Sequence, residues 1–449
     1  MLFCSFTFLL LFMPAVLLGH KLLPQKAKRP FLLAASLLFY AWGSPLWLIL
    51  LLYVLVLDWA GALFMTRGGK QRKAVLAGLI ILNVLPLLYY KYTGFFLETV
   101  RGLTGWGMAF DDPVLPAGIS FFTFQGISYL IDVYRGQAKP QRSIVRFGVY
   151  LTLFPQLVAG PIVRYTDLEA QLDSPANVTP AGIRHGLARF TVGLGKKVLL
   201  ADAMGRLWGT INGDFASAGS IGAVIGILAF SFQIFFDFSG YSDMALGLGE
   251  AMGFRLPENF DRPYREDSIT GFWRHWHMTL TTWFREYVYF PLGGSRCSVL
   301  RRNVNILIVW ALTGLWHGAG WNYVLWGLYF AALLMIEKRF MLKKAWYEAI
   351  PRLLRRVVTF VLVVIGWGLF SGFGGQLAGT IFAFSPISSK ALLTCVSYLP
   401  MMLVCAGISF APAIKLPMPV KRVLTILLFL LCLAALAAEG FAPFVYFQF

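Results

Sequence analysis

Residues 303–337 read NVNILIVWALTGLWHGAGWNYVLWGLYFAALLMIE, an apolar stretch between basic clusters at 296–302 and 338–339. As one helix this stretch would measure about 52 Å, at a rise of about 1.5 Å per residue. The hydrocarbon core of a bilayer is only about 30 Å thick. If both basic flanks face the cytoplasm, the segment must enter the membrane and turn back. We expect the break within Gly314-Leu315-Trp316-His317-Gly318-Ala319-Gly320-Trp321-Asn322, which places His317 deep in the membrane.

An ionisable side chain at that depth needs an explanation. Irregular backbone and a titratable group are tolerated inside a membrane only where protein or a water-filled cavity surrounds them. His317 is therefore either a functional group or a core histidine bonded to a backbone carbonyl, and we favour function.

The rest of the chain is also typical of a membrane protein. Of its 449 residues, 58% are hydrophobic and 13% are charged, and the mean hydropathy is +0.68. This lies outside the usual range of soluble domains. Apolar stretches long enough to span a bilayer recur from residues 1–19 to residues 423–438. The first has no basic residues before it and no clear small-residue cleavage site, and it is interpreted as a retained span. We expect one all-α, polytopic membrane domain over residues 1–449.

The net charge of +18 comes from short Lys and Arg clusters between apolar segments. This pattern favours cytoplasmic loops near anionic lipid or an anionic cofactor, and it argues against nucleic acid as a partner. The positive-inside rule places both termini outside the cytoplasm. The spans it orders are 1–19, a hairpin over 31–66, 74–92 followed by an outer loop with Glu98, Asp111 and Asp112, 114–134, 357–372, 391–413 and 423–440; residues 146–300 stay unassigned.

A second unusual stretch, residues 259–294, mixes charged and aromatic side chains. Its large apolar residues recur every three or four positions, which predicts one stripe of a helix with His277 beside it. The alternative is an interfacial helix whose Trp and Arg residues only anchor it. His275 and His277 are two positions apart and point to different sides of a helix, so no metal site is expected. The apolar stripe consists of Ile269, Phe272, Trp273, Trp276, Leu280, Trp283 and Tyr287.

We expect structural roles for two further sets of residues, the cysteines and two aspartates. The five cysteines show no paired or metal-ligand spacing, and four of them lie in apolar segments, so we interpret them as small core residues. Asp237 and Asp243 lie in an apolar segment, and we expect them to satisfy buried polar groups and not to bind substrate.

Several of these stretches together resemble the membrane-bound O-acyltransferase family, and most of all its bacterial branch typified by the membrane subunit of alginate O-acetylation. The resemblance implies a ring of about eleven transmembrane helices, with re-entrant and interfacial pieces, around a central tunnel. It matches His317 to the family's invariant histidine and His277 to its second signature histidine. Relatives often carry Arg at His275, which is given no catalytic role. The matching stretches are residues 155–162, 237–243, 259–264, 272–287 and 315–318.

The same resemblance implies a reaction. Acetyl-CoA is the expected donor, with no other cofactor, and the acetyl group crosses the bacterial inner membrane to an extracytoplasmic polysaccharide. An extracytoplasmic SGNH-type acetyltransferase is the expected partner for final transfer. His317 would act as general base, while His277 would orient the thioester or share the proton. Arginines at a cytoplasmic mouth would hold the CoA phosphates, and the candidates are Arg262, Arg265, Arg285, Arg296, Arg301 and Arg302.

The C-terminal residues 444–449, FVYFQF, also resemble a tail in this branch. A related tail belongs to a small partner of teichoic acid D-alanylation, whose tyrosine is thought to carry the acyl group. Tyr446 is therefore the expected first acceptor; the alternative is an aromatic anchor at the membrane interface.

Two other functions stay open. D-alanyl or longer-chain acyl transfer would keep the chemistry and change the cargo. A transporter or channel would also explain broken helices and buried ionisable groups, although the sequence shows no internal repeat.

Overall fold

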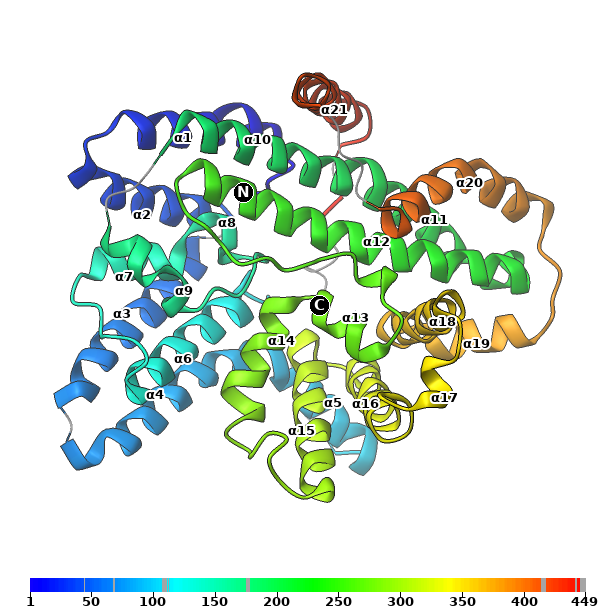
Figure 1. Ribbon diagram of the computed structural model, residues 1–449, viewed down its shortest axis with the longest axis horizontal. Helices are drawn as coiled ribbons and strands as arrows, with labels where there is room; N and C mark the ends of the chain where they lie inside the picture. Colours follow the sequence, from blue (N-terminus) through cyan, green and yellow to red (C-terminus); the bar gives the residue numbers. More distant parts are fainter. Residues whose placement is uncertain are drawn as a thin grey trace. The chain divides into compact units, whose positions relative to one another are not determined.

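The computed structural model describes residues 1–43, 45–67, 69–106, 111, 113–174, 178–412, 417–440 and 442–444. Within these residues the secondary structure is entirely helical, which confirms the predicted all-α class (Figure 1). In chain order the elements are η1 Thr7–Phe12, α1 Met13–Leu22, α2 Gln25–Ala41, α3 Pro45–Arg67, η2 Gly69–Gln71, α4 Arg72–Leu87, η3 Leu88–Tyr92, α5 Thr93–Thr104, α6 Ile119–Arg135, α7 Ile144–Thr152, α8 Phe154–Leu157, α9 Tyr165–Asp173, α10 Pro180–Gly195, η4 Lys196–Ala201, α11 Asp202–Gly213, α12 Phe215–Ala251, η5 Pro263–Arg265, α13 Ile269–His275, α14 Met278–Phe284, η6 Arg285–Tyr289, α15 Val299–His317, α16 Trp321–Ile336, η7 Glu337–Met341, α17 Ala345–Glu348, α18 Arg352–Phe370, α19 Gly374–Phe382, α20 Ser389–Phe410 and α21 Met418–Glu439.

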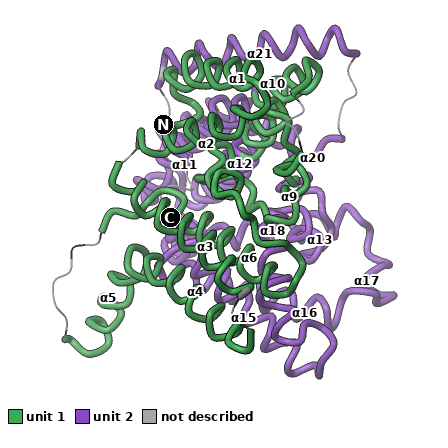
Figure 2. Tube along the Cα trace, turned by 90° about the vertical axis from the view of Figure 1, so that its left-hand side faces the viewer, with its two compact units in different colours: residues 1–190, 242–258 green, residues 191–241, 259–449 purple. Residues whose placement is uncertain are grey.

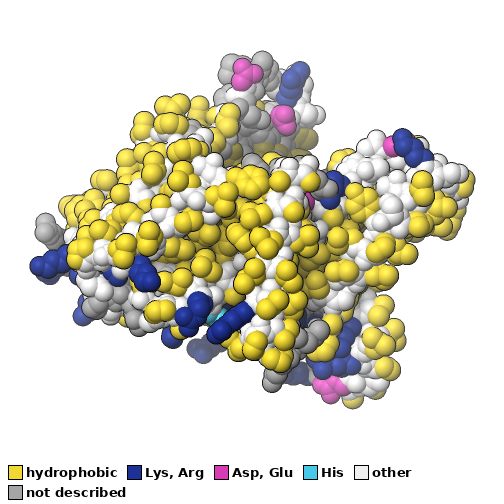
Figure 3. Space-filling view, turned by 90° about the horizontal axis from the view of Figure 1, so that it is seen from above, with side chains coloured by type: hydrophobic (Ala, Val, Ile, Leu, Met, Phe, Trp, Pro, Cys, Tyr) yellow, Lys and Arg dark blue, Asp and Glu magenta, His cyan; other side chains and the backbone are white. Residues whose placement is uncertain are grey.

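Six stretches of helix in the described residues are long and apolar enough to cross a membrane. Many of their large apolar side chains are exposed, as expected for surfaces that face lipid. The face drawn in Figure 3 is accordingly dominated by hydrophobic side chains, with Lys and Arg in small separate groups. The six are Pro45–Thr66, Gly69–Thr104, Phe215–Ala251, Arg352–Phe370, Ser389–Phe410 and Met418–Ala438.

The chain divides into two compact units, coloured separately in Figure 2. Unit 1 comprises residues 1–190 and 242–258, and unit 2 comprises residues 191–241 and 259–449. In unit 1, a buried polar pair joins α3 to α4, because Asn83 Nδ2 donates to Asp58 Oδ1 at 2.7 Å. Unit 2 contains a large aromatic core that draws on α11, α12, α13, α16 and α18.

The predicted turn within residues 303–337 is confirmed. Helix α15 ends at His317, Gly318 and Gly320 are extended, and α16 begins at Trp321. The two helices lie side by side (Figure 1). Their backbones approach so closely at Gly327 that an added Cβ would lie 2.3 Å from the carbonyl oxygen of Trp310. This hairpin fixes the position of His317 within unit 2.

The loop expected after residue 92 begins later, and its assignment to the outer side stays a prediction. Helix continues through η3 and α5 to Thr104, so Glu98 lies on a helix. No proline interrupts residues 93–104, and the helix ends where Gly105 adopts a left-handed conformation with φ of 71°. Asp111 does lie outside any helix, and Asp112 falls outside the described residues.

Candidate functional site

The helix expected through residues 269–287 is broken at Trp276 and His277. Helix α13 ends at His275, Trp276 is extended, and His277 has a φ of 43°, in the left-handed region that β-carbon sterics disfavour. A neighbouring loop satisfies the backbone at the break. Asn259 O accepts from Met278 N at 2.9 Å, and Asp261 N donates to His275 O at 3.0 Å. Strain of this kind is concentrated at functional sites.

Hydrogen bonds determine which nitrogen of His277 carries the proton. Asn259 Oδ1 accepts from the backbone N–H of Thr279 at 3.3 Å and lies 3.1 Å from His277 Nδ1. Since a backbone N–H can only donate, the shared Asn259 atom is the amide oxygen, and Nδ1 of His277 must donate to it. The proton therefore sits on Nδ1, and Nε2 retains its lone pair. Nε2 is buried and has no hydrogen-bond partner among the described residues.

His277 is held in an apolar and aromatic surrounding. Its side chain is 1% exposed, and the ring of Phe238 meets it edge to face at a centroid distance of 4.7 Å. His277 lies outside all six candidate spans. Burial, with a smaller contribution from His317, lowers the pKa of His277 well below its ordinary value. The ring is therefore neutral at physiological pH and can accept a proton.

His317, the last residue of α15, lies next to His277. The two ring centroids are 6.4 Å apart, although the residues are far apart in sequence. His317 is also buried and has Trp326 and Phe370 edge to face, with centroids at 5.1 and 5.4 Å. The structure thus brings together the two histidines that the sequence singled out.

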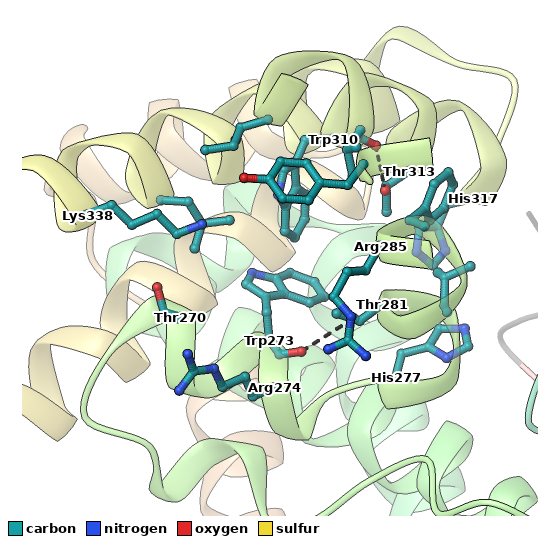
Figure 4. Close-up of a pocket in the computed structure, with 16 residues that line it drawn as sticks. Thr270, Trp273, Arg274, His277, Thr281, Arg285, Trp310, Thr313, His317 and Lys338 are labelled. Atoms are coloured by element: carbon teal, nitrogen blue, oxygen red, sulfur yellow. Dashed lines mark hydrogen bonds between the residues drawn. The ribbon is translucent and has the colours of Figure 1, made fainter. Parts of the chain in front are cut away.

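Both histidines line a cavity of about 310 Å³ in unit 2. Figure 4 shows them at one end of this cavity and Lys338 at the other, with Arg285 between. Most of the wall is aromatic or aliphatic, as is usual for small-molecule sites. The lining residues are Thr270, Trp273, Arg274, His277, Leu280, Thr281, Phe284, Arg285, Tyr289, Ile306, Val309, Trp310, Thr313, His317, Leu334 and Lys338.

The basic residues of the cavity differ from most of those expected. Arg285 lines it, but Arg262, Arg265 and Arg296 do not. Arg262 and Arg296 are exposed in loops, and Arg265 ends the short helix η5. Charge and sequence proximity alone could not identify which arginines turn inward.

Two cations, Arg274 and Lys338, were missed as site residues and do line the cavity. Their signals in the sequence were weak. Arg274 lies three residues before His277, and Lys338 opens a basic cluster. The cavity therefore has cations from three separate elements.

A buried carboxylate also holds two walls of the cavity together. Glu337, 3% exposed, accepts from Ile269 N at 2.7 Å and from Thr270 N at 2.8 Å. These N–H groups belong to the first turn of α13, whose donors have no partner within the helix. Glu337 therefore fixes α13, with Trp273 and Arg274, to the end of α16. A single acidic residue at the end of an apolar helix was the only sequence signal.

The carboxylates of α12 and the cysteines have the structural surroundings that the sequence predicts. Asp237 accepts from Lys197 Nζ at 2.7 Å, and Asp243 accepts from Arg189 Nε at 3.0 Å, which supports structural roles for both carboxylates. Four of the five cysteines are buried, as expected of core residues. Tyr446 lies outside the described residues, so its role stays a prediction.

Comparisons with known proteins identify the family. The profile of MBOAT, the membrane-bound O-acyltransferase family, matches residues 134–367. The chain belongs to this family and is an acyltransferase and a multi-pass membrane protein. It is 34% identical to a probable alginate O-acetylase AlgI of Azotobacter vinelandii, over 100% of both chains. It is 39% identical to the protein of that name in Pseudomonas aeruginosa, over 84% of this chain and 73% of the relative. A peptidoglycan O-acetyltransferase of Helicobacter pylori is 33% identical, over 82% and 77% of the two chains.

Proposed function

We propose that the protein transfers an acetyl group from cytoplasmic acetyl-CoA, through the bacterial inner membrane, to an extracytoplasmic polysaccharide. The observation that carries this proposal is the cavity with two buried histidines at one end and Lys338 at the other, lined also by Arg274 and Arg285 (Figure 4). Its relatives include enzymes named for O-acetylation of alginate and of peptidoglycan. We further expect about eleven spans to surround this path, with both termini outside.

The cations support an anionic donor. Lys338 belongs to the basic cluster that the positive-inside rule assigns to the cytoplasm. Phosphate groups of CoA cannot enter the hydrocarbon core at a tolerable free energy. Arg274, Arg285 and Lys338 would bind these phosphates, and the apolar part of the cavity would receive the thioester.

The protonation state of His277 suggests how transfer proceeds. An acceptor hydroxyl gives its proton to Nε2 of His277 while its oxygen attacks the thioester carbonyl. The carbon–sulfur bond then breaks, and the departing CoA thiolate takes the proton, giving an acetyl ester and free CoA. His317 orients the thioester or the hydroxyl from the other side. The family resemblance favours His317 as the general base and His277 as the orienting residue. We assign the opposite roles, because the hydrogen bonds to Asn259 leave the lone pair on Nε2 of His277.

The test uses purified protein in lipid nanodiscs with radiolabelled acetyl-CoA, and ester formation is measured as label on any acceptor hydroxyl, whether of Tyr446 or of an added soluble polysaccharide. His277→Ala and His317→Ala should each lower the rate of ester formation by roughly 100-fold or more, the usual contribution of a general acid or base. His275→Ala is the matched control, because His275 is half-buried and does not line the cavity. Full transfer by either variant would contradict the proposal. Parallel reactions with D-alanyl and long-chain donors separate acetyl transfer from the other acyl transfers.

Tyr446 is proposed as the first acceptor. Mass spectrometry of the C-terminal peptide after incubation with acetyl-CoA should show a mass increase of one acetyl group on Tyr446. Tyr446→Phe should abolish the increase, while Phe447→Leu, next to it, should not. An unmodified Tyr446 in protein that actively releases CoA would refute the carrier role. An extracytoplasmic SGNH-type partner would complete transfer to the polymer.

A further inference from the structure

A buried ion cluster lies in unit 2, and none of its residues lines the cavity. Lys197 of η4 has a side chain that is 1% exposed, and its Nζ lies 2.7 Å from Asp237 Oδ1 and 2.8 Å from Asp202 Oδ1. A buried ammonium group costs much free energy unless every donor finds a partner. Two of its three donors are satisfied by these carboxylates.

The remaining partners come from the C-terminal segment. Lys197 Nζ donates to Pro443 O at 3.2 Å and lies 4.8 Å from the ring centroid of Phe444. An ammonium over an aromatic face at this distance is a cation–π contact. Phe444 is 2% exposed, and Tyr241 of α12 meets it edge to face at 4.9 Å. The segment after α21 therefore places a carbonyl oxygen and an aromatic ring against buried Lys197 and Tyr241.

The same face of α12 also contacts the candidate active site. Phe238, whose ring meets His277 at 4.7 Å, lies three residues before Tyr241. Residues three apart are neighbours on one helix face. Phe238 and Tyr241 thus connect His277 to Phe444 through one turn of helix. Tyr446 is two residues beyond Phe444, a reach of about 7 Å at most.

We propose that Lys197 and Asp237 form a docking site for this chain's own C-terminal segment, and that Lys197 is a positioning residue for the residues that follow Phe444. The docking is independent of any chemistry. Its consequence for transfer deepens the function proposed above and rests on it. A purely structural ion cluster would neutralise the two carboxylates without affecting the tail.

The first experiment tests docking in the full chain, in nanodiscs. Tyr241→p-benzoylphenylalanine places a photo-crosslinker beside Phe444, and peptide mapping should find the cross-link on residues 442–449. Phe444→Ala, which leaves the ion cluster intact, should lower the cross-link yield by about fivefold or more. Lys197→Met should do the same, and Lys196→Met is its matched control. Cross-links only to other segments, or an unchanged yield in Phe444→Ala, would overturn the docking site even if Lys197→Met fails to fold.

The second experiment tests positioning. Phe444→Leu keeps apolar volume but removes the aromatic face, so kcat for acetyl transfer should fall about fivefold while KM for acetyl-CoA stays unchanged. Phe444→Trp should restore kcat, because it restores the cation–π contact. An unchanged kcat in Phe444→Leu would overturn the positioning role. If the wild type transfers no acetyl group at all, the proposed function fails, whereas the cross-linking result still decides the docking site.

Discussion

At the scale of single residues, the site depends on one amide. Asn259 Oδ1 accepts hydrogen bonds from Thr279 N, Thr279 Oγ1 and His277 Nδ1. These bonds set both the ring orientation and the tautomer of His277. The left-handed backbone of His277 is retained because the neighbouring loop supplies partners on both sides of the break. With its ring held in this way, His277 presents the lone pair of Nε2 as a proton acceptor.

Asn259→Leu should lower kcat at least about tenfold, because the imidazole loses the acceptor that fixes its tautomer. Asn259→Asp keeps the shape and the acceptor but adds a negative charge, which raises the pKa of His277. A proton acceptor must be neutral, so the acidic limb of the pH–rate profile should move to higher pH. Rate measurements from pH 5 to 9 on both variants check this. An unmoved acidic limb in Asn259→Asp would favour His317 as the base.

At the scale of elements, two close contacts between helices build the cavity. Glu337 fixes α13 to the end of α16, and α15 packs against α16 with glycine at the contact. An added Cβ at Gly314 would lie 2.3 Å from Tyr323 O, and the equivalent contact at Gly327 involves Trp310 O. Backbone carbonyls cannot move aside as flexible side chains do, so the hairpin tolerates only glycine at these positions.

Gly327→Ala should therefore separate α15 from α16 and lower the free energy of unfolding by about 1–3 kcal/mol, the usual cost of overpacking. The displacement also moves His317, so transfer should fall. Thermal unfolding in detergent and the acetyl-transfer rate measure the two effects. Gly407→Ala in α20 is the matched control, because an added Cβ there meets no atom within 4 Å. Equal stability of both variants would contradict the close contact between Gly327 and the carbonyl oxygen of Trp310.

At the scale of the whole molecule, the distribution of charge predicts orientation. The basic clusters, including residues 338–356, are assigned to the cytoplasm, and three apolar helices, α18, α20 and α21, follow the last large cluster. An odd number of crossings would leave the C-terminus outside, on the side of the proposed polysaccharide acceptor. The cations of the cavity then face the side on which acetyl-CoA is made.

Reporter fusions in Escherichia coli test this orientation. Alkaline phosphatase fused after Phe449 should be active, because it folds only outside the cytoplasm, and green fluorescent protein at the same position should stay dark. Fusions after Lys344 should give the reverse result and serve as the internal control. A fluorescent fusion after Phe449 would contradict the assigned orientation and would separate Tyr446 from an outer acceptor.

The sequence by itself determined the membrane class, the turn after His317 and the two candidate histidines. These follow from composition, segment length and local chemistry, which are properties of neighbours along the chain. Only the tertiary structure decided that His277 interrupts a helix, that Asn259 fixes its tautomer, and that Arg274 and Lys338 line the cavity while Arg262 does not. It also brought Lys197 to the C-terminal segment. Such contacts depend on the direction of each side chain after packing, and helical periodicity cannot specify packing between segments far apart in sequence.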